Sequence, residues 1–405
     1  MSHHRPVPRV ADDHTTLDEL GPRLFRIGLA LGLIGLAIAA GLGYSRGDGL
    51  EAFGWSYLLN FSFFLSLSLG ALFFVAIGHI TGSRWNIVVR RLAEVTAANL
   101  STMALAALPL MLLAGRVFPW ASGRTHAPAE LLAAKEPYLN LEFFYLRWAV
   151  YFLIWCGFSW WYWKRSVEQD STGDPALSIR MSRRSGLVLL LFALSVSLAS
   201  YDLLMSLDPS WFSTMFGPYF FAGGFVGFIC FLTLITFWLQ GRGRLQTVIH
   251  IEHLHDYGKF MFAFVFFWAY LAFSQYMLIW YANIPEETAW FLTRQSNGWG
   301  WIGLVLIFGH FLLPFVGLMS LTAKRRRASL MFWAVWILIM HWVDLYWLVM
   351  PEFRPATPTV DWLDLFTFIG LGGIYIAGIA RLASRHSLIP TRDPRLDDSL
   401  AFENS

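Results

Sequence analysis

Two aspartates occupy matching positions in apolar stretches of the sequence. Asp202 lies seven residues before Pro209 in YDLLMSLDP, and Asp344 lies seven residues before Pro351 in VDLYWLVMP. Seven helical residues span about 10 Å, so each carboxyl group is expected roughly two turns below a membrane surface. Because charge at that depth is costly, such residues commonly mark proton or ion routes. The alternative interpretation is that each aspartate is a buried structural hydrogen-bond acceptor.

Other polar side chains are placed to extend a relay from these two carboxyl groups. His341 is three residues before Asp344 and shares its helix face. Ser195 and Ser206 share a face with the first aspartate, and His310 lies near the middle of another apolar stretch. Carboxyl, imidazole and hydroxyl groups exchange donor and acceptor roles with water, as a proton relay requires. We therefore predict no catalytic residue, and a proton-transfer role for Asp202, Asp344, His341, His310, Ser195 and Ser206.

The segment HIEHLHDYGK, His250–Lys259, gathers histidines and acids just before an apolar stretch. It is interpreted as a solvated approach to the membrane or a docking surface, and it could also collect protons for a half-channel. The residues of this hypothesis are His253, His255 and Asp256, joined by His79 from the end of another apolar stretch. Their spacing is not that of a closed metal site, so no metal is expected.

Haem and iron–sulfur clusters are not expected in this chain. The histidines inside apolar stretches show no repeated spacing that would pair them around a haem, and no C-x-x-C-H sequence occurs. Cys156 and Cys230 stand singly in apolar runs and are interpreted as small core residues.

The composition predicts an all-α integral membrane protein. Of the 405 residues, 56% are hydrophobic and 14% are charged, whereas soluble domains carry about 25% charged residues. A membrane helix needs about 20 apolar residues, and the sequence offers about ten such stretches. They are approximately Leu24–Tyr44, Tyr57–Ile80, Ala93–Leu113, Phe143–Trp163, Gly186–Leu207, Met215–Leu239, Phe260–Ala282, Trp299–Leu321, Leu330–Met350 and Trp362–Leu382.

The paired Asp-to-Pro spacing also predicts an internal repeat. Spans two to five and six to nine are expected to form two four-helix bundles of the same orientation, with spans one and ten peripheral. The expected divisions are a cytoplasmic segment (1–21), a first peripheral helix and loop (22–56), the two bundles (57–209 and 210–351), a last peripheral helix (352–385) and a mobile cytoplasmic tail (386–405).

Basic residues predict the orientation of the spans. Of the 30 Lys and Arg, 23 fall on one side of the predicted membrane and six on the other. Positive charge accumulates in cytoplasmic loops, so both termini are expected in the cytoplasm.

Two helices carry patterns that predict how they pack. Tyr270, Ser274, Met277 and Tyr281 repeat at helical spacing, and this polar aromatic stripe is expected to be buried among other helices. Gly223 and Gly227 form a G-x-x-x-G pattern typical of close helix packing.

Two longer motifs resemble a known family. AYLAFSQYMLIWYANIPEE (Ala269–Glu287) and SLDPSWFSTMFGPYFFAGG (Ser206–Gly224) resemble the second large membrane subunit of bacterial alternative complex III, a quinol:cytochrome c oxidoreductase. That family, conventionally named quinone-binding subunit 2, belongs to the NrfD-like polysulfide-reductase membrane-subunit superfamily. The resemblance covers roughly Trp55–Arg381 and is strongest over Tyr201–Glu287.

The resemblance implies a cofactor-free subunit of the bacterial inner membrane. It implies partners bearing multihaem cytochrome c, monohaem cytochrome c and iron–sulfur clusters, together with a paralogous ten-helix membrane subunit. Quinone or quinol is a possible ligand, with proton conduction or scaffolding as equally compatible roles. No nucleic-acid partner is expected.

Two other functions stay open. A stand-alone secondary transporter is compatible with parallel repeats and intramembrane aspartates, although no span is conspicuously broken by Gly and Pro. A purely structural membrane anchor would tolerate replacement of both aspartates.

Overall fold

The computed structural model describes residues 9–125 and 127–404, and within them the chain is entirely helical and loop, without strands. Ten helical spans in these residues are long and apolar enough to cross a membrane, which confirms the prediction of a multi-pass all-α protein. The uninterrupted spans are α1 (Leu20–Ser45), α2 (Glu51–Ile80), α9 (Leu141–Thr172), α10 (Pro175–Leu203), α11 (Phe216–Gly241), α12 (Ile251–Ala282), α17 (Arg327–Phe353) and α18 (Trp362–Ala383).

The other two spans are interrupted helices. The third span consists of α3 (Ile87–Ala98), α4 (Leu100–Ala106) and α5 (Leu108–Leu112). The eighth span consists of α14 (Trp299–Val305), the π-helical segment η3 (Leu306–Leu312) and α15 (Leu313–Gly317). Proline supplies no N–H and its ring crowds the carbonyl four residues earlier. Pro109 and Pro314 therefore account for breaks at α5 and directly after η3.

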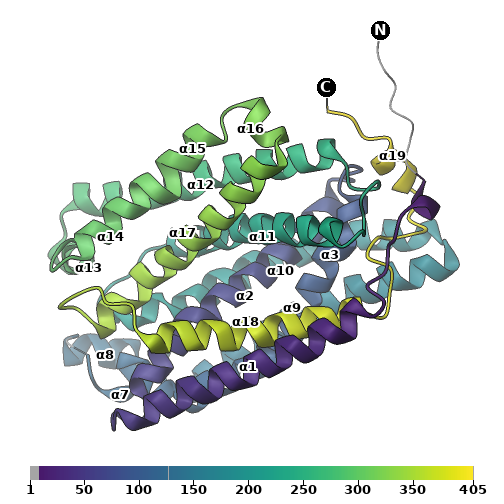
Figure 1. The fold of residues 1–405 in the computed structure, drawn as a ribbon. Coiled ribbons are helices and arrows are strands. Elements are labelled where there is room, and N and C mark those ends of the chain that lie inside the picture. The colour runs from purple at the N-terminus through teal and green to yellow at the C-terminus, as the bar shows by residue number, and fades with distance from the viewer. Residues whose placement is uncertain (1–8, 126, 405) are drawn as a thin grey trace.

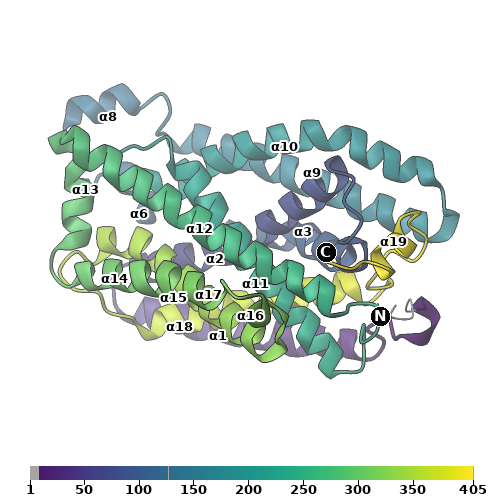
Figure 2. The same ribbon diagram turned by 90° about the horizontal axis from the view of Figure 1, so that it is seen from above.

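Helices α2 and α11 form the centre of the bundle (Figures 1 and 2). In their most apolar windows, 89% and 78% of the residues are buried, against 22% for α1. Helix α11 packs on α2, α10, α12 and α17, so a polar group on any of these neighbours can point into protein rather than lipid.

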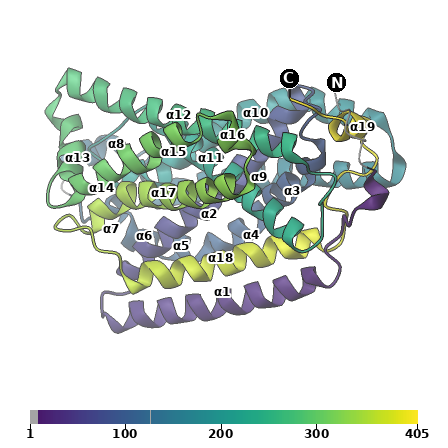
Figure 3. The ribbon, with the colours of Figure 1, turned by 45° about the horizontal axis from the view of Figure 1, so that its top comes forward.

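Helices α1 and α18 pack side by side along one edge of the bundle (Figure 3). Their contact is made by facing glycines, because a Cβ built on Gly373 would lie 2.5 Å from the backbone nitrogen of Gly32. A side chain at either position would separate the pair.

Short helices cover the two ends of the bundle (Figure 1). We call the end that carries both chain termini the terminal face; η1 (Val10–Asp12), α16 (Leu321–Arg325) and α19 (Leu396–Leu400) lie there. The opposite face carries α6 (Ala114–Val117), α7 (Pro119–Ser122), α8 (Ala129–Lys135) and α13 (Pro285–Gln295). Because α10 and α17 both end at the opposite face, Asp202 and Asp344 lie in the half of the bundle nearest to it.

The segment predicted as a mobile tail, 386–405, is instead docked on the terminal face over its described residues. Leu388, Ile389 and Leu400 are buried. Asp393 forms an ion pair with buried Arg90 at 2.7 Å. The hydroxyl group of Ser399 donates to the carbonyl of Trp85 at 2.7 Å. Burial alone would raise the pKa of Asp393, but Arg90 outweighs it and holds that pKa at about 2.

Candidate proton-transfer site

Asp344 of α17 is a buried carboxyl group held by neutral donors. Its side chain is 2% exposed. The Tyr219 hydroxyl of α11 donates to one carboxyl oxygen, and the indole N–H of Trp268 on α12 donates to the other at 3.1 Å. No cationic side chain among the described residues forms an ion pair with it. A buried carboxylate without a compensating cation is costly, so this group is suited to taking up and releasing a proton.

His341 lies one helical turn from Asp344 and presents an unprotonated nitrogen. Its Nε2 is 2.9 Å from the hydroxyl oxygen of Ser66 on α2, and that hydroxyl donates to the carbonyl of Phe63 at 2.7 Å. A serine hydroxyl has one hydrogen, so Nε2 of His341 must be the donor to Ser66. Nδ1 then carries a lone pair, and it has no hydrogen-bond partner among the described residues. It is a free proton acceptor.

The G-x-x-x-G pattern of α11 makes room for this imidazole. A Cβ on Gly223 would lie 3.1 Å from Nδ1 of His341 and 3.6 Å from Cδ1 of Trp268. A Cβ on Gly227 would lie 3.0 Å from Cδ2 of the same histidine. The glycines therefore bring α11 close to α17 and place His341 beside Trp268, whose neighbouring ring atom donates to Asp344.

His310 completes the cluster from the far side of Trp268. It lies in η3, its ring centroid is 4.0 Å from that of Trp268, and it is fully buried. Neither ring nitrogen has a hydrogen-bond partner in the described part of the chain. Single π-helical turns frequently occur at functional sites, and this one turns a titratable ring toward the cluster.

An aromatic pocket adjoins the cluster. The pocket has a volume of about 690 Å³ and lies between α12, α13, α14–η3 and the end of α17. Tyr219 and Trp268, the two donors to Asp344, form part of its wall, together with Phe311 and Trp347. A molecule in this pocket would therefore touch the donors that hold the carboxyl group.

Arg294 of α13 supplies the positive end of the pocket. It is 1% exposed, stacks on Trp290 with 3.5 Å between the guanidinium carbon and the ring centroid, and forms an ion pair with Glu352 at 3.1 Å. It also donates to the carbonyls of Trp347 and Leu348, at the end of α17. Burial lowers its pKa to about 10, with Glu352 opposing the shift, so it is still charged at neutral pH.

Asp202 differs from Asp344 because it is ion-paired. Arg147 of α9 donates to both of its carboxyl oxygens, at 2.8 and 2.9 Å, and the Tyr151 hydroxyl donates at 2.9 Å. Arg147 also donates to the carbonyl of Tyr138 and stacks on that ring. A two-point ion pair stabilises the charged carboxylate, so the structure favours the structural interpretation of Asp202.

The serines predicted beside Asp202 are also bound to structural partners. The indole N–H of Trp155 donates to Ser195 at 2.9 Å, and that of Trp120 donates to Ser206 at 3.1 Å. Ser206 in turn donates to the backbone carbonyl of Asp202. These contacts join α9 and α7 to the α10 end of the bundle.

The residues proposed for proton uptake lie in two places on the terminal half. His253 is held in the cap of α12, where its Nδ1 accepts from the backbone N–H of His250, and its Nε2 is 3.0 Å from the Ser399 carbonyl. His255 is 6% exposed, and Asp256 forms an ion pair with Lys259. These contacts favour a structural link between α12 and the docked tail.

Within the described residues, the ring of His79 adds no hydrogen bond to that link. It is fully buried, stacks on Tyr162 of α9 with centroids 5.3 Å apart, and neither ring nitrogen has a hydrogen-bond partner within the described residues.

The aromatic stripe on α12 faces outward, contrary to its predicted burial. Tyr270, Met277 and Tyr281 are exposed, with 83% of Tyr281 accessible. The buried face of the helix instead carries Trp268 and Gln275. Tyrosine and tryptophan are also favoured on lipid-facing surfaces near membrane interfaces, which is why their spacing alone misassigned the face.

Reasoning from sequence missed the aromatic and cationic members of the site. Tyr219 lies inside the second motif and Trp268 directly precedes the first, but neither position has a charge that would draw attention. Arg147 lies within the fourth predicted span, and its distance from the end of that span is similar to that of Asp202 in the next, so their pairing had a readable signal.

Comparison with protein-family models and with curated proteins gave no match to this sequence. The described residues contain no cluster of three or more His, Cys, Asp or Glu able to hold a metal ion.

Proposed function

We propose that this chain is an integral membrane subunit of a bacterial quinol:cytochrome c oxidoreductase similar to alternative complex III, and that Asp344 exchanges protons there. The observation that carries the chemical role is the pairing of a buried carboxyl group with two neutral donors, Tyr219 and Trp268, that also line a pocket. The assignment to a quinol-linked complex rests on the two sequence motifs.

The geometry supports a short proton path. Nδ1 of His341, one helical turn from Asp344 on the same face of α17, has no hydrogen-bond partner among the described residues, and the ring of His310 packs on Trp268. Water or the headgroup of a quinol in the aromatic pocket would supply the proton at the Tyr219 wall. Arg294 would favour a ligand oxygen that gains negative charge, because its guanidinium is still charged at neutral pH.

In this proposal the membrane arrangement follows the predicted repeat. Helices α2 to α10 and α11 to α17 form the two bundles, and α1 and α18 are peripheral. The terminal face is cytoplasmic because the basic loops gather there. The partners are multihaem and monohaem cytochrome c subunits, an iron–sulfur subunit and a paralogous ten-helix subunit.

The test begins with tagged purification of the full-length chain from its native membranes. A stoichiometric partner set with c-type haem absorbance is expected, and quinol:cytochrome c turnover is then compared between wild type, Asp344→Asn and Asp344→Glu. Loss of a positioned proton-transfer group typically costs about a hundredfold or more, and Asp344→Glu should retain part of the activity. Unchanged turnover in an assembled Asp344→Asn complex would refute the proton role.

One observation favours a secondary transporter instead. The π-helical η3 interrupts the eighth span beside the pocket, and transporters place their binding sites at interrupted helices. A colourless protein that purifies alone and carries a proton-dependent substrate flux in liposomes would support that alternative.

A further inference from the structure

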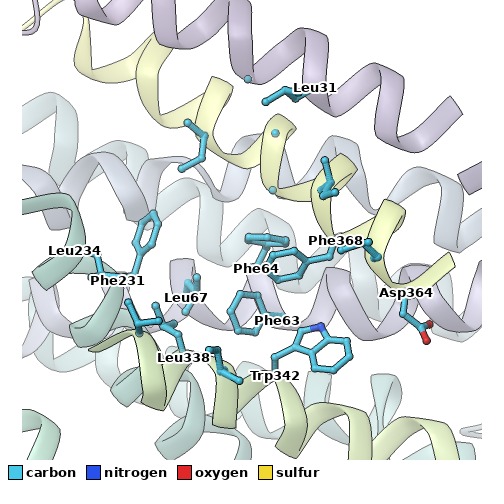
Figure 4. A pocket seen from close by; sticks show the side chains of 18 of the residues that line it. Leu31, Phe63, Phe64, Leu67, Phe231, Leu234, Leu338, Trp342, Asp364 and Phe368 are labelled. Carbon is cyan, nitrogen blue, oxygen red and sulfur yellow. The ribbon is translucent and has the colours of Figure 1, made fainter. Parts of the chain in front are cut away.

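A second cavity lies on the other side of α17, toward the α1–α18 pair (Figure 4). This groove has a volume of about 670 Å³. Its floor is formed by Phe63, Phe64 and Leu67 of α2, none more than 6% exposed. Its rim is open, because Leu31 of α1 and Ile339 of α17 are each 51% exposed.

The groove offers hydrocarbon contacts and almost nothing else. Its two residues with notable polar groups are Asp364 and Trp342, and both already have partners. Asp364 accepts from Ser56 and Arg354, and the indole N–H of Trp342 donates to Asn60 at 2.8 Å. A ligand with polar groups along its length would lose its hydrogen bonds to water without replacement. An apolar chain would not.

The groove is long enough for one extended acyl chain. Along α18 the lining runs from Asp364 to Ile376, a distance of about 18 Å at the helical rise. Half of a bilayer's hydrocarbon core is about 15 Å thick. Along α1 the lining continues to Leu24, four residues from the end of that helix on the terminal face, so the groove runs from the opposite face past the middle of the bundle.

Oppositely charged side chains lie near the end of the groove at the opposite face. Asp361 forms ion pairs with Arg46 at 2.5 Å and with Arg354 at 3.7 Å, and Arg46 is part exposed. Neighbouring cationic and anionic groups at this depth complement a phosphate and an ammonium group in one headgroup.

We infer that the groove holds one acyl chain of a zwitterionic phospholipid from the leaflet at the opposite face. The chain lies on Phe63, whose ring centroid is 5.5 Å from that of His341. The acyl chain thereby covers the outer side of Phe63. It keeps water from reaching the imidazole of His341 through the groove. The inference does not depend on Asp344 moving protons.

Native mass spectrometry of the full-length chain tests this inference. The protein is ejected from micelles of a mild detergent, and the lipid that it then releases is identified by mass. Leu31→Trp places an indole in the groove, and Leu33→Trp is the matched control, because Leu33 is an α1 leucine of similar exposure (57%) outside the groove. Ile339→Trp fills the groove from α17 and guards against a folding defect peculiar to α1.

The expected result is one retained phospholipid on the wild type and on Leu33→Trp. The ratio of lipid-bound to lipid-free chain should fall by roughly tenfold, or about 1.4 kcal/mol, in both groove variants. Equal retention in Leu31→Trp and Leu33→Trp would overturn the assignment, as would a wild type that retains no phospholipid. Release of an isoprenoid quinone in place of the phospholipid would also overturn it.

Discussion

The two aspartates should respond in opposite ways to the same substitution. Asp202→Asn removes the charge that Arg147 faces at 2.8 and 2.9 Å, in a pair whose side chains are 0% and 7% exposed. Breaking a buried ion pair on one side costs about 3 to 5 kcal/mol. Arg147 retains its bond to the Tyr138 carbonyl, so the lower end of that range, about 3 kcal/mol, is expected.

Asp344→Asn should be far milder for stability. The amide keeps one oxygen for the donors Tyr219 and Trp268, so it weakens one neutral hydrogen bond, at a cost of about 1 kcal/mol. Its effect on turnover should be the larger one, about a hundredfold, because an amide cannot release a proton. Asp202→Asn protein that stays folded should keep most of its turnover.

The assay pairs unfolding in mixed micelles with turnover of the assembled protein. A double variant, Arg147→Leu with Asp202→Leu, is the control, because removing both charges avoids the uncompensated one and should recover part of the lost stability. Equal destabilisation by Asp344→Asn and Asp202→Asn would contradict the difference between the two sites. Loss of proton-coupled activity in folded Asp202→Asn protein would contradict it as well.

Two further perturbations test the packing around the site and at the tail. Gly227→Ala places a methyl group 3.0 Å from both His341 and Leu67. It should lower the free energy of unfolding by about 1 to 3 kcal/mol and reduce turnover. The control is Gly241→Ala on the same helix, which meets open space and should change neither quantity. Asp393→Asn should weaken tail docking by roughly 3 kcal/mol because Arg90 loses a buried partner. Hydrogen exchange of residues 388–400 measures this, with exposed Asp397→Asn as the control; equal protection in the two variants would contradict it. Because the pKa of Asp393 is lowered from 3.8 to about 2, its contribution is complete above pH 3.8 and is lost as the pH falls toward 2.

The ten spans were predictable because hydrophobic length alone identifies a membrane helix. Which face of a span meets lipid was not, as the exposed Tyr270 and Tyr281 of α12 show. In a membrane protein both faces of a helix are apolar, so periodicity carries less information than it does in water. The π-helical η3 was not predicted, although Pro314 just after it is a helix-breaking residue that the sequence shows.

The sequence predicted some members of the candidate site correctly and misplaced others. The three-residue spacing placed His341 and Asp344 on one face, and the structure brings both beside Trp268. It does not bring Ser195 or Ser206 to them, because those serines serve the α10 end of the bundle. The tail was misjudged because its polar residues outnumber its apolar ones, while docking depends on a few positions such as Leu388 and Asp393.

The contrast between Asp202 and Asp344 explains how one spacing in the sequence can serve two purposes. Both carboxyl groups lie seven residues before a proline, but α10 ends one residue after Asp202, whereas α17 continues for nine residues beyond Asp344. At Asp202 a cation from the neighbouring helix fixes the charge, and the pair joins α9 to the end of α10. At Asp344 the corresponding neighbours are a tyrosine and a tryptophan, which stabilise the carboxyl group whether or not it carries a proton. Proton exchange is therefore expected where the cation is missing, beside a pocket that opens to a ligand, and not where the spacing alone would place it.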